Sequence, residues 1–126
     1  MTYFLDMETT LAIAARAIEG DPVVADFGLL ESALARAKTS VMGQDAYPSV
    51  HGKAAALLHS LTKNHCLVDG NKRLAWLATA AFCFINGFLV EAPDDDVYDF
   101  VISIADGTLS DVTVIAAQLQ RWSHNI

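Results

Sequence analysis

Apolar side chains recur at helical spacing along almost the whole chain, and this periodicity limits what the chain can fold into. Alternation of apolar and polar residues, which would indicate half-buried strands, is hard to find. With 126 residues the chain has the size of one domain, so we expect a single all-α domain over 1–126 with one core. The pattern predicts six helices, at approximately 8–19, 28–38, 49–63, 71–85, 94–107 and 111–122.

The helix expected at 71–85 is apolar nearly all round after its first turn, so we place it at the centre of the bundle. The uncharged stretch runs on to Val90 and covers 17 residues, which reaches the lower limit for crossing a bilayer. Asn86 and Gly87 interrupt it as a helix stop. The stretch therefore favours a buried helix of a bundle, and we expect no membrane association.

Residues 39–48 form the longest stretch without helical periodicity, and they are rich in turn formers such as Gly43, Asp45 and Pro48. We expect a small flap or short hairpin here, beside a functional site. Ser49 follows it and is expected to cap the next helix.

Two features favour a cytoplasmic protein. Cys66 and Cys83 are too few for a disulfide framework, and both lie in apolar stretches where a free thiol packs as a small hydrophobic group. The first basic residue is Arg16, so the first ten residues do not have the pattern of a secretory signal or transit peptide.

Charge is distributed unevenly along the chain. The formal net charge is −7, which argues against direct binding of nucleic acid because phosphate neutralisation needs a broad basic surface. Residues 32–73, however, hold six basic and two acidic residues, whereas the rest of the chain holds two basic and thirteen acidic ones. The basic segment could hold a small anion such as a nucleotide, or its charges could scatter over helix surfaces as ordinary solvation.

The segment that carries chemistry is His-Cys-Leu-Val-Asp-Gly-Asn-Lys-Arg at 65–73, which opens the central helix. Free backbone N–H groups at a helix N-terminus attract anions, and Gly70 leaves room for a phosphate to approach. Lys72 and Arg73 add full positive charges. We therefore expect Gly70, Asn71, Lys72 and Arg73 to form a phosphate-binding turn.

His65 and Asp69 suggest two separate roles within this segment. Asp69 is a hard carboxylate ligand suited to Mg²⁺, and His65 can accept a proton from a hydroxyl near neutral pH. Alternatively, Asp69 is the N-cap of the following helix and His65 is a partly buried, hydrogen-bonded histidine. Their occurrence together beside the phosphate turn favours the catalytic interpretation.

The nonapeptide at 65–73 resembles the motif of the Fic superfamily, and Lys72 resembles the death-on-curing (Doc) branch, because most Fic adenylyltransferases have glycine there. Residues 28–36 and 53–58 also resemble that branch. The similarity covers about residues 27–87, and it implies a compact six-helix Fic/Doc-like bundle around the helix at 71–85.

The resemblance implies a toxin of a toxin–antitoxin pair that uses ATP and Mg²⁺ to phosphorylate a threonine of translation elongation factor Tu. In that case His65 is the general base, Asp69 the Mg²⁺ ligand, Lys72 a catalytic and phosphate-contacting residue, and Lys63 a further phosphate contact. The partner implied is a Phd-like antitoxin whose disordered C-terminal segment folds into a groove near the motif.

Two positions depart from the family pattern. Leu67 replaces the usual phenylalanine, so we expect a loop anchor of smaller area and a slightly less rigid site. Cys66 replaces proline or an aliphatic residue, and we expect it to be packed and to have no redox role.

Three other functions remain open on the residues alone. The same base, metal and phosphate turn could transfer AMP instead of a phosphoryl group, and only Lys72 and the family likeness separate the two. A helical module that binds a partner without catalysis would not need the motif. A zinc protein or metal-dependent hydrolase built on His51, His59, His65 and Cys66 lacks any metal-binding spacing, so we expect His51, His59 and His124 at the surface or its boundary.

Overall fold

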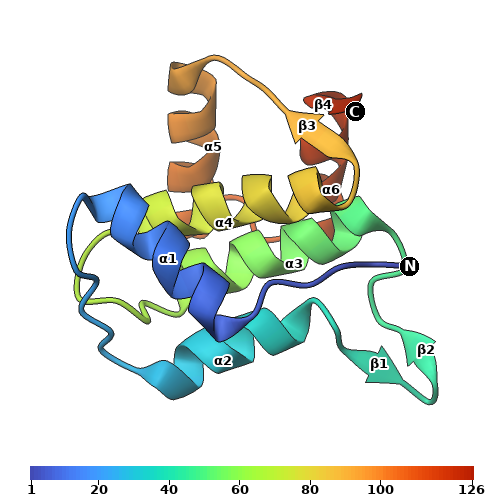
Figure 1. Ribbon diagram of the computed structural model, residues 1–126. Helices are drawn as coiled ribbons and strands as arrows, with labels where there is room; N and C mark the ends of the chain where they lie inside the picture. Colours follow the sequence, from blue (N-terminus) through green and yellow to red (C-terminus); the bar gives the residue numbers. More distant parts are fainter.

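The computed structural model of the chain describes residues 1–126, and it is predominantly helical (Figure 1). Six helices and two small antiparallel strand pairs make up the fold, so the predicted all-α bundle is confirmed. Every helix begins and ends within two residues of its predicted bounds. The elements are α1 (Met7–Ile18), α2 (Phe27–Arg36), β1 (Ser40–Val41), β2 (Gln44–Asp45), α3 (Val50–Lys63), α4 (Asn71–Ile85), β3 (Phe88–Val90), α5 (Asp94–Ala105), α6 (Val112–Arg121) and β4 (Ser123–Asn125).

The helix starts follow from short polar side chains that accept backbone hydrogen bonds. Asp6, Asp26, Ser49 and Asp111 each cap a helix by accepting from an N–H group in its first turn. Ser49 therefore caps α3 as predicted, with Oγ 2.9 Å from the Gly52 nitrogen. The start of α4 has no side-chain cap, which makes it different from these four.

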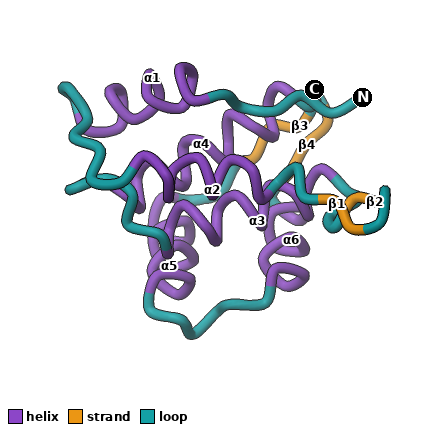
Figure 2. Tube along the Cα trace, turned by 90° about the horizontal axis from the view of Figure 1, so that it is seen from below, coloured by secondary structure: helices purple, strands orange, loops and turns teal.

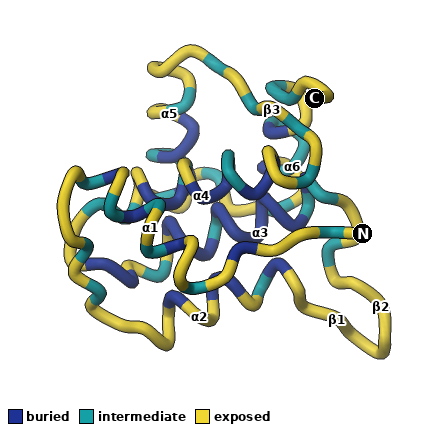
Figure 3. Tube along the Cα trace, in the orientation of Figure 1, coloured by how far each residue is buried: buried dark blue, intermediate teal, exposed yellow.

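Helices α3 and α4 lie side by side and form the centre of the bundle (Figures 1 and 3). The prediction of a buried central helix at 71–85 is confirmed, but α3 is buried more completely: ten of its 14 residues are buried, against six of the 15 in α4. Small, fully buried alanines such as Ala55 and Ala78 let the two helices approach closely. One side of α4 stays accessible, where Leu77, Phe84 and Ile85 are exposed.

The other helices pack around this pair on two sides. Helix α1 lies across one side of α4, and α5 and α6 lie on the opposite side of the pair (Figure 2). The core is a cluster of 21 buried residues drawn from all six helices, the loop before α4 and Leu5 ahead of α1. No helix combines the length and apolar character that crossing a membrane requires.

The hairpin of β1 and β2 confirms the predicted flap at 39–48, but it lies elsewhere than expected. Strand residues Ser40 and Val41 pair with Asp45 and Gln44, and Met42 and Gly43 turn the chain with φ of 54° and 81°. The hairpin precedes the N-terminal end of α3, whereas His65 follows its C-terminal end (Figure 1). A helix of this length spans about 20 Å, so the flap is not beside the 65–73 segment.

Strands β3 and β4 are the elements that the periodicity did not reveal. Phe88, Leu89 and Val90 pair with Asn125, His124 and Ser123, respectively. The pairing attaches the end of the chain to the turn after α4. His51 on α3 supports it, because its Nε2 lies 2.8 Å from Ser123 Oγ and its ring lies 4.6 Å from that of Phe88.

Candidate active site

The loop between α3 and α4 presents His65 to solvent. Asn64 ends α3, and its side-chain amide donates to the Leu29 carbonyl at 3.2 Å. The next residue, His65, is exposed and has a left-handed backbone, with φ of 50°. Its imidazole makes no hydrogen bond within the chain, so both ring nitrogens are available to an external group. The alternative of a buried, internally satisfied histidine is therefore wrong.

The loop is fastened to the connection between α1 and α2. Ala25 and Asp26 both donate backbone hydrogen bonds to the Cys66 carbonyl, at 2.8 and 3.2 Å. Val68 donates to the Val23 carbonyl at 2.9 Å. Together with an antiparallel bridge between residues 24 and 67, these bonds hold the loop against a segment about forty positions earlier in the chain.

Two buried side chains anchor the loop from below. Leu67 is 2% exposed and belongs to the core cluster, so leucine fills the anchoring position. Cys66 is fully buried, as expected, and burial raises the pKa of its thiol. Burial also raises the pKa of the Cys83 thiol to about 12. Neither thiol has the lowered pKa that a reactive cysteine needs.

Asn71 locks the loop onto the first residue of α4. Its side-chain oxygen accepts from the Leu67 N–H, and its side-chain nitrogen donates to the Leu67 carbonyl, both at 2.9 Å. The amide therefore satisfies both backbone groups of the anchoring residue. In this arrangement the Asn71 side chain bonds both backbone groups of Leu67, and its backbone N–H stays without an acceptor.

Gly70 is required by the backbone and by packing. Its φ is 85°, and a Cβ placed on it would lie 2.4 Å from Ile18 Cγ2 at the end of α1. A side chain here would therefore meet α1. Glycine at this position therefore has a structural cause, the close packing of Ile18. This cause is separate from the phosphate approach expected from the sequence.

Asp69 does not cap α4, because Gly70 occupies the N-cap position. The Asp69 side chain is exposed, and its Oδ1 accepts from the Gly70 N–H at 2.8 Å. Its second oxygen has no partner in the chain. The carboxylate is thus held in place by one oxygen and can offer the other to a cation.

The first turn of α4 exposes three backbone donors. The first N–H group of the helix to find an acceptor is that of Leu74, which donates to Gly70 at 2.9 Å. The N–H groups of Asn71, Lys72 and Arg73 have no acceptor, and no side chain caps them. Such a terminus attracts anions.

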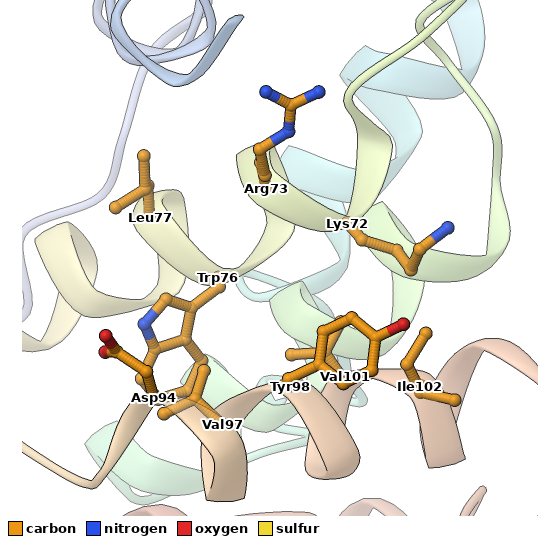
Figure 4. Close-up of a pocket in the computed structure, with 9 residues that line it drawn as sticks. All are labelled: Lys72, Arg73, Trp76, Leu77, Asp94, Val97, Tyr98, Val101 and Ile102. Atoms are coloured by element: carbon orange, nitrogen blue, oxygen red, sulfur yellow. The ribbon is translucent and has the colours of Figure 1, made fainter.

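Lys72 and Arg73 point in different directions from this turn (Figure 4). Arg73 extends toward α1, and its Nη1 donates to the Ala17 carbonyl at 3.3 Å. Lys72 extends to the other side, toward Tyr98 and Ile102 of α5. The two charges therefore flank the helix start and do not gather at one point.

An apolar cavity of about 300 Å³ lies between α4 and α5 and begins at Lys72. Tyr98 and Ile102 line the end near Lys72, and Trp76 and Asp94 line the other end (Figure 4). Sequence reasoning missed these α5 residues, since 94–105 has the pattern of an ordinary amphipathic helix. Only the packing of α5 against α4 reveals them.

Lys63 is the last residue of α3, and its side chain reaches the C-terminal end of α5. Its Nζ donates to the Ala105 carbonyl at 3.2 Å, a position where a cation complements the helix dipole. Hydrogen bonds with Thr108 lower the pKa of Asp106, and the nearby Lys63 ammonium lowers it further. The Lys63 ammonium therefore has its hydrogen bond at the end of α5 and none within the 65–73 segment.

The basic residues of 32–73 do not form one patch, as the solvation alternative predicts. Arg36 bonds His59, Ser60 and Tyr47, and buried Lys53 bonds Asp45 and the carbonyls of Tyr47 and Pro48. Lys38 lies over the Phe4 ring. Of the six cations, Lys72 alone has neither a hydrogen bond nor an aromatic partner within the chain.

His51 and His59 serve packing, whereas His124 is exposed in β4. His51 is 7% exposed and is buried rather than at the surface, and burial lowers its pKa. His59 is half-buried, and burial, Arg36 and Lys63 together lower its pKa. No three His, Cys, Asp or Glu side chains gather closely enough to hold a metal ion between them.

Comparisons with known proteins agree with the resemblance of the motif. Residues 4–83 match the Fic/DOC family, a range that includes the 65–73 segment and most of α4. The chain is also 46% identical over 130 residues to "Toxin Doc" of Mycolicibacterium smegmatis, and the alignment covers 98% of this chain and 95% of that protein. Helices α5 and α6 thus lie outside the family match and inside the alignment with this relative.

Proposed function

Because this chain belongs to the Fic/DOC family, we propose that it is the toxin of a toxin–antitoxin pair and phosphorylates a threonine of elongation factor Tu, with Mg-ATP as the donor. One observation carries the proposal. An exposed imidazole, an exposed carboxylate and three unpartnered backbone N–H groups occur within one tightly fastened stretch of nine residues. Elongation factor Tu as the substrate would place the reaction in the cytoplasm.

In this proposal His65 accepts the proton of the threonine hydroxyl as its oxygen bonds to the γ-phosphorus. The backbone N–H groups of Asn71, Lys72 and Arg73 hold phosphate oxygens, and the Lys72 and Arg73 side chains flank them. The bond between the γ-phosphorus and the bridging oxygen breaks, which leaves phosphothreonine and ADP. Positioning and charge stabilisation supply most of the catalysis in such a transfer.

The residues present fit a Mg²⁺ ion that is coordinated by the protein and by the phosphates of the nucleotide together. Asp69 offers one free oxygen, and no group of three His, Cys, Asp or Glu side chains surrounds it. This matches the usual preference of Mg²⁺ for one or two carboxylates completed by phosphates and water. The ion would neutralise phosphate charge, and Asp69 would hold it at the mouth of the first turn.

Lys72 supports phosphoryl transfer over AMP transfer. It is the unpartnered cation of the basic segment, and it occupies the α5 side of the first turn, where most Fic adenylyltransferases have no side chain. A long cation here leaves less room for the usual nucleotide pose, so it favours delivery of the γ-phosphate. If Lys72→Gly left phosphoryl transfer unchanged, this role would be wrong.

The decisive experiment is intact-mass analysis of elongation factor Tu, and of a whole translation extract, after incubation with the protein, ATP and Mg²⁺. A gain of one phosphate that His65→Ala abolishes supports the proposal. A gain of one nucleotide monophosphate would establish AMP transfer instead. Growth arrest that survives both His65→Ala and Asp69→Ala would favour a binding module without catalysis.

We also propose a Phd-like antitoxin as the partner. Its disordered C-terminal segment would fold into a groove near the motif, and the cavity between α4 and α5 adjoins the motif at Lys72. Co-expression with the protein encoded beside this toxin should restore growth. Absence of rescue by that protein would remove the antitoxin assignment.

A further inference from the structure

The backbone at His65 makes a left-handed turn without the hydrogen bond that normally holds such a turn. Its φ of 50° lies in a region that is sterically disfavoured for a residue with a side chain. A left-handed residue at the end of a helix is usually held by a backbone N–H group that donates to the preceding turn. His65 follows Asn64 at the end of α3, yet neither its N–H nor that of Cys66 donates to a carbonyl of α3.

The other left-handed residues at helix ends in this chain all have that bond. They are Glu19 at the end of α1, Gly87 after α4 and Gly107 after α5. The N–H of Glu19 donates to a carbonyl of the last turn of α1. Those of the two glycines do the same in α4 and α5, at 3.1 and 3.2 Å. His65 is therefore the exception, and its conformation has to be held from outside α3.

Two tethers, one on each side of the turn, reach the start of α2. On the C-terminal side, the Cys66 carbonyl accepts from the N–H groups of Ala25 and Asp26. On the N-terminal side, the Asn64 side-chain amide donates to the Leu29 carbonyl at 3.2 Å. Asp26 also caps α2, because its side chain accepts from the Leu29 N–H at 3.0 Å. Both tethers thus end on the same capped turn.

We propose that Asn64 is a positioning residue for His65, and that its amide holds the left-handed backbone from which the imidazole reaches the acceptor hydroxyl. The role of His65 as the base rests on the proposed function. A base must lie within hydrogen-bond reach of the proton that it accepts. The imidazole has no partner in the chain, so its place depends on the backbone that carries it. Asn64 forms the one tether that comes from a side chain, so a substitution can remove it.

The test measures kcat and KM of Asn64→Ala with elongation factor Tu and Mg-ATP. Without the amide, the backbone at His65 is free to relax toward the favoured right-handed region and to carry the imidazole away from the hydroxyl. We expect kcat to fall about 10–100-fold, because a displacement of about 1 Å can reduce a rate by up to about 100-fold. The KM for each substrate should stay unchanged, because the whole 65–73 segment keeps its residues.

The conformation of His65 can be measured without any substrate, from the NMR coupling between its amide and α protons. This coupling depends on φ. The wild type should give the value of a left-handed residue, and Asn64→Ala should give a different value because the turn relaxes.

Asn86→Ala is the matched control. Asn86 follows α4 as Asn64 follows α3, and it is also half-buried. Its side chain donates to the Tyr3 carbonyl and accepts from the Tyr3 N–H, both at 2.8 Å. The control should lower the melting temperature at least as much as Asn64→Ala, because it loses more hydrogen bonds. It should leave kcat and the His65 coupling unchanged.

The outcomes separate this inference from the proposed function. If Asn64→Ala keeps the wild-type kcat or the wild-type coupling, the positioning role is wrong and the catalytic assignment of His65 stands. If both asparagine variants lose kcat in proportion to their loss of melting temperature, the effect is general destabilisation, and the positioning role is also wrong. If the wild type transfers neither phosphate nor AMP, the proposed function fails, whereas the coupling still decides whether the Asn64 amide holds the His65 backbone.

Discussion

His65 combines two properties that folding does not require: it is exposed, and its imidazole has no partner in the chain. We expect His65→Ala to reduce the rate of transfer by about 10²–10⁴-fold, the usual contribution of a general base. Its melting temperature should match that of the wild type, because no contact is lost. Phosphate incorporation and thermal unfolding measure the two effects. An active His65→Ala variant would exclude the base assignment.

Two constraints act on Gly70, the left-handed backbone and the contact with Ile18, and a comparison with Gly43 measures them separately. Gly70→Ala faces the left-handed φ and the Ile18 overlap, whereas Gly43→Ala in the hairpin faces a similar φ of 81° with nothing within 4 Å. We expect about 1–2 kcal/mol of destabilisation for Gly43→Ala. Gly70→Ala should cost about 1–3 kcal/mol more, as overpacking does. Urea unfolding gives both values.

Adding Ile18→Ala is the check on this interpretation. The second substitution removes the methyl group that the new Cβ would meet, so it should recover part of the loss in Gly70→Ala. Equal destabilisation of Gly70→Ala and Gly43→Ala would mean that Ile18 and α1 move away from the new Cβ without loss of stability.

The sequence order showed that the candidate residues lie together, but it did not show their surroundings. The order of residue types at 65–73 indicated a base, a cation ligand and an anion-binding helix start, and all three occupy one loop and helix start. The sequence could not show that the Asn71 amide bonds both backbone groups of Leu67, nor that Arg73 and Lys63 reach helix ends at Ala17 and Ala105. Those contacts depend on tertiary packing across many positions.

The β1–β2 hairpin is attached to α3 by a buried cation. The Lys53 side chain is 3% exposed, and it donates to Asp45 and to the Tyr47 and Pro48 carbonyls, whereas the Asp45 side chain is 60% exposed. We expect Lys53→Met to lower the free energy of unfolding by about 1–3 kcal/mol, because two carbonyls lose their donor. Asp45→Asn should cost about 0–1 kcal/mol, as for a surface ion pair. Urea unfolding tests the order, and the reverse order would mean that the carboxylate holds the hairpin.

Two histidines connect α3 to its neighbours and should make stability depend on pH. His51 bonds β4 and His59 bonds Arg36 of α2, and folding lowers the pKa of each below the ordinary value of 6.5. As pH falls through 6.5, the unfolded chain takes up protons before the folded one, so stability is lost on the acid side and is full above that value.

The urea concentration at the unfolding midpoint should therefore decrease as the pH is lowered from about 7.5 to 5.5. The double variant His51→Gln, His59→Gln should show a flatter profile over the same range. Asp6 and Asp106, whose pKa values are lowered from 3.8, act only at more acidic pH and do not confuse this window. A midpoint that rises on acidification would contradict the assignment.

Helices were easier to predict than strands, for a physical reason. Repeated apolar spacing over ten or more residues carries a strong helical signal, and caps such as Ser49 mark the ends. β4 has only three residues, Ser-His-Asn, and no apolar alternation. It forms because β3 offers backbone partners. The turn residues at 39–48 predicted the β1–β2 hairpin. Its distance from the 65–73 segment could not be predicted, because it depends on the direction of α3.

The whole molecule should respond to its proposed donor. A ligand that binds the folded state at a hundredfold above its Kd contributes about 2.7 kcal/mol, which corresponds to a rise of roughly 5–15 °C in melting temperature for a chain of this size. We expect Mg-ATP to produce this rise in the wild type and in His65→Ala. Lys72→Ala should reduce it, because the unpartnered cation is lost.

Adenosine is the matched ligand control, since it has no phosphates. It should give little or no shift. An equal shift with adenosine would place the binding energy in the base and sugar, and it would count against the first turn of α4 as the phosphate site.

The fastening of the 65–73 segment to Val23, Ala25 and Asp26 limits how far this motif can be transplanted. The nonapeptide supplies neither the carbonyl nor the two N–H groups that hold its backbone; a segment about forty positions away does. Grafting the nine residues onto the start of a helix in another scaffold would move the chemistry without its support. A designer would have to carry over the α1–α2 connection as well, with the small gap beside Ile18 that admits only glycine.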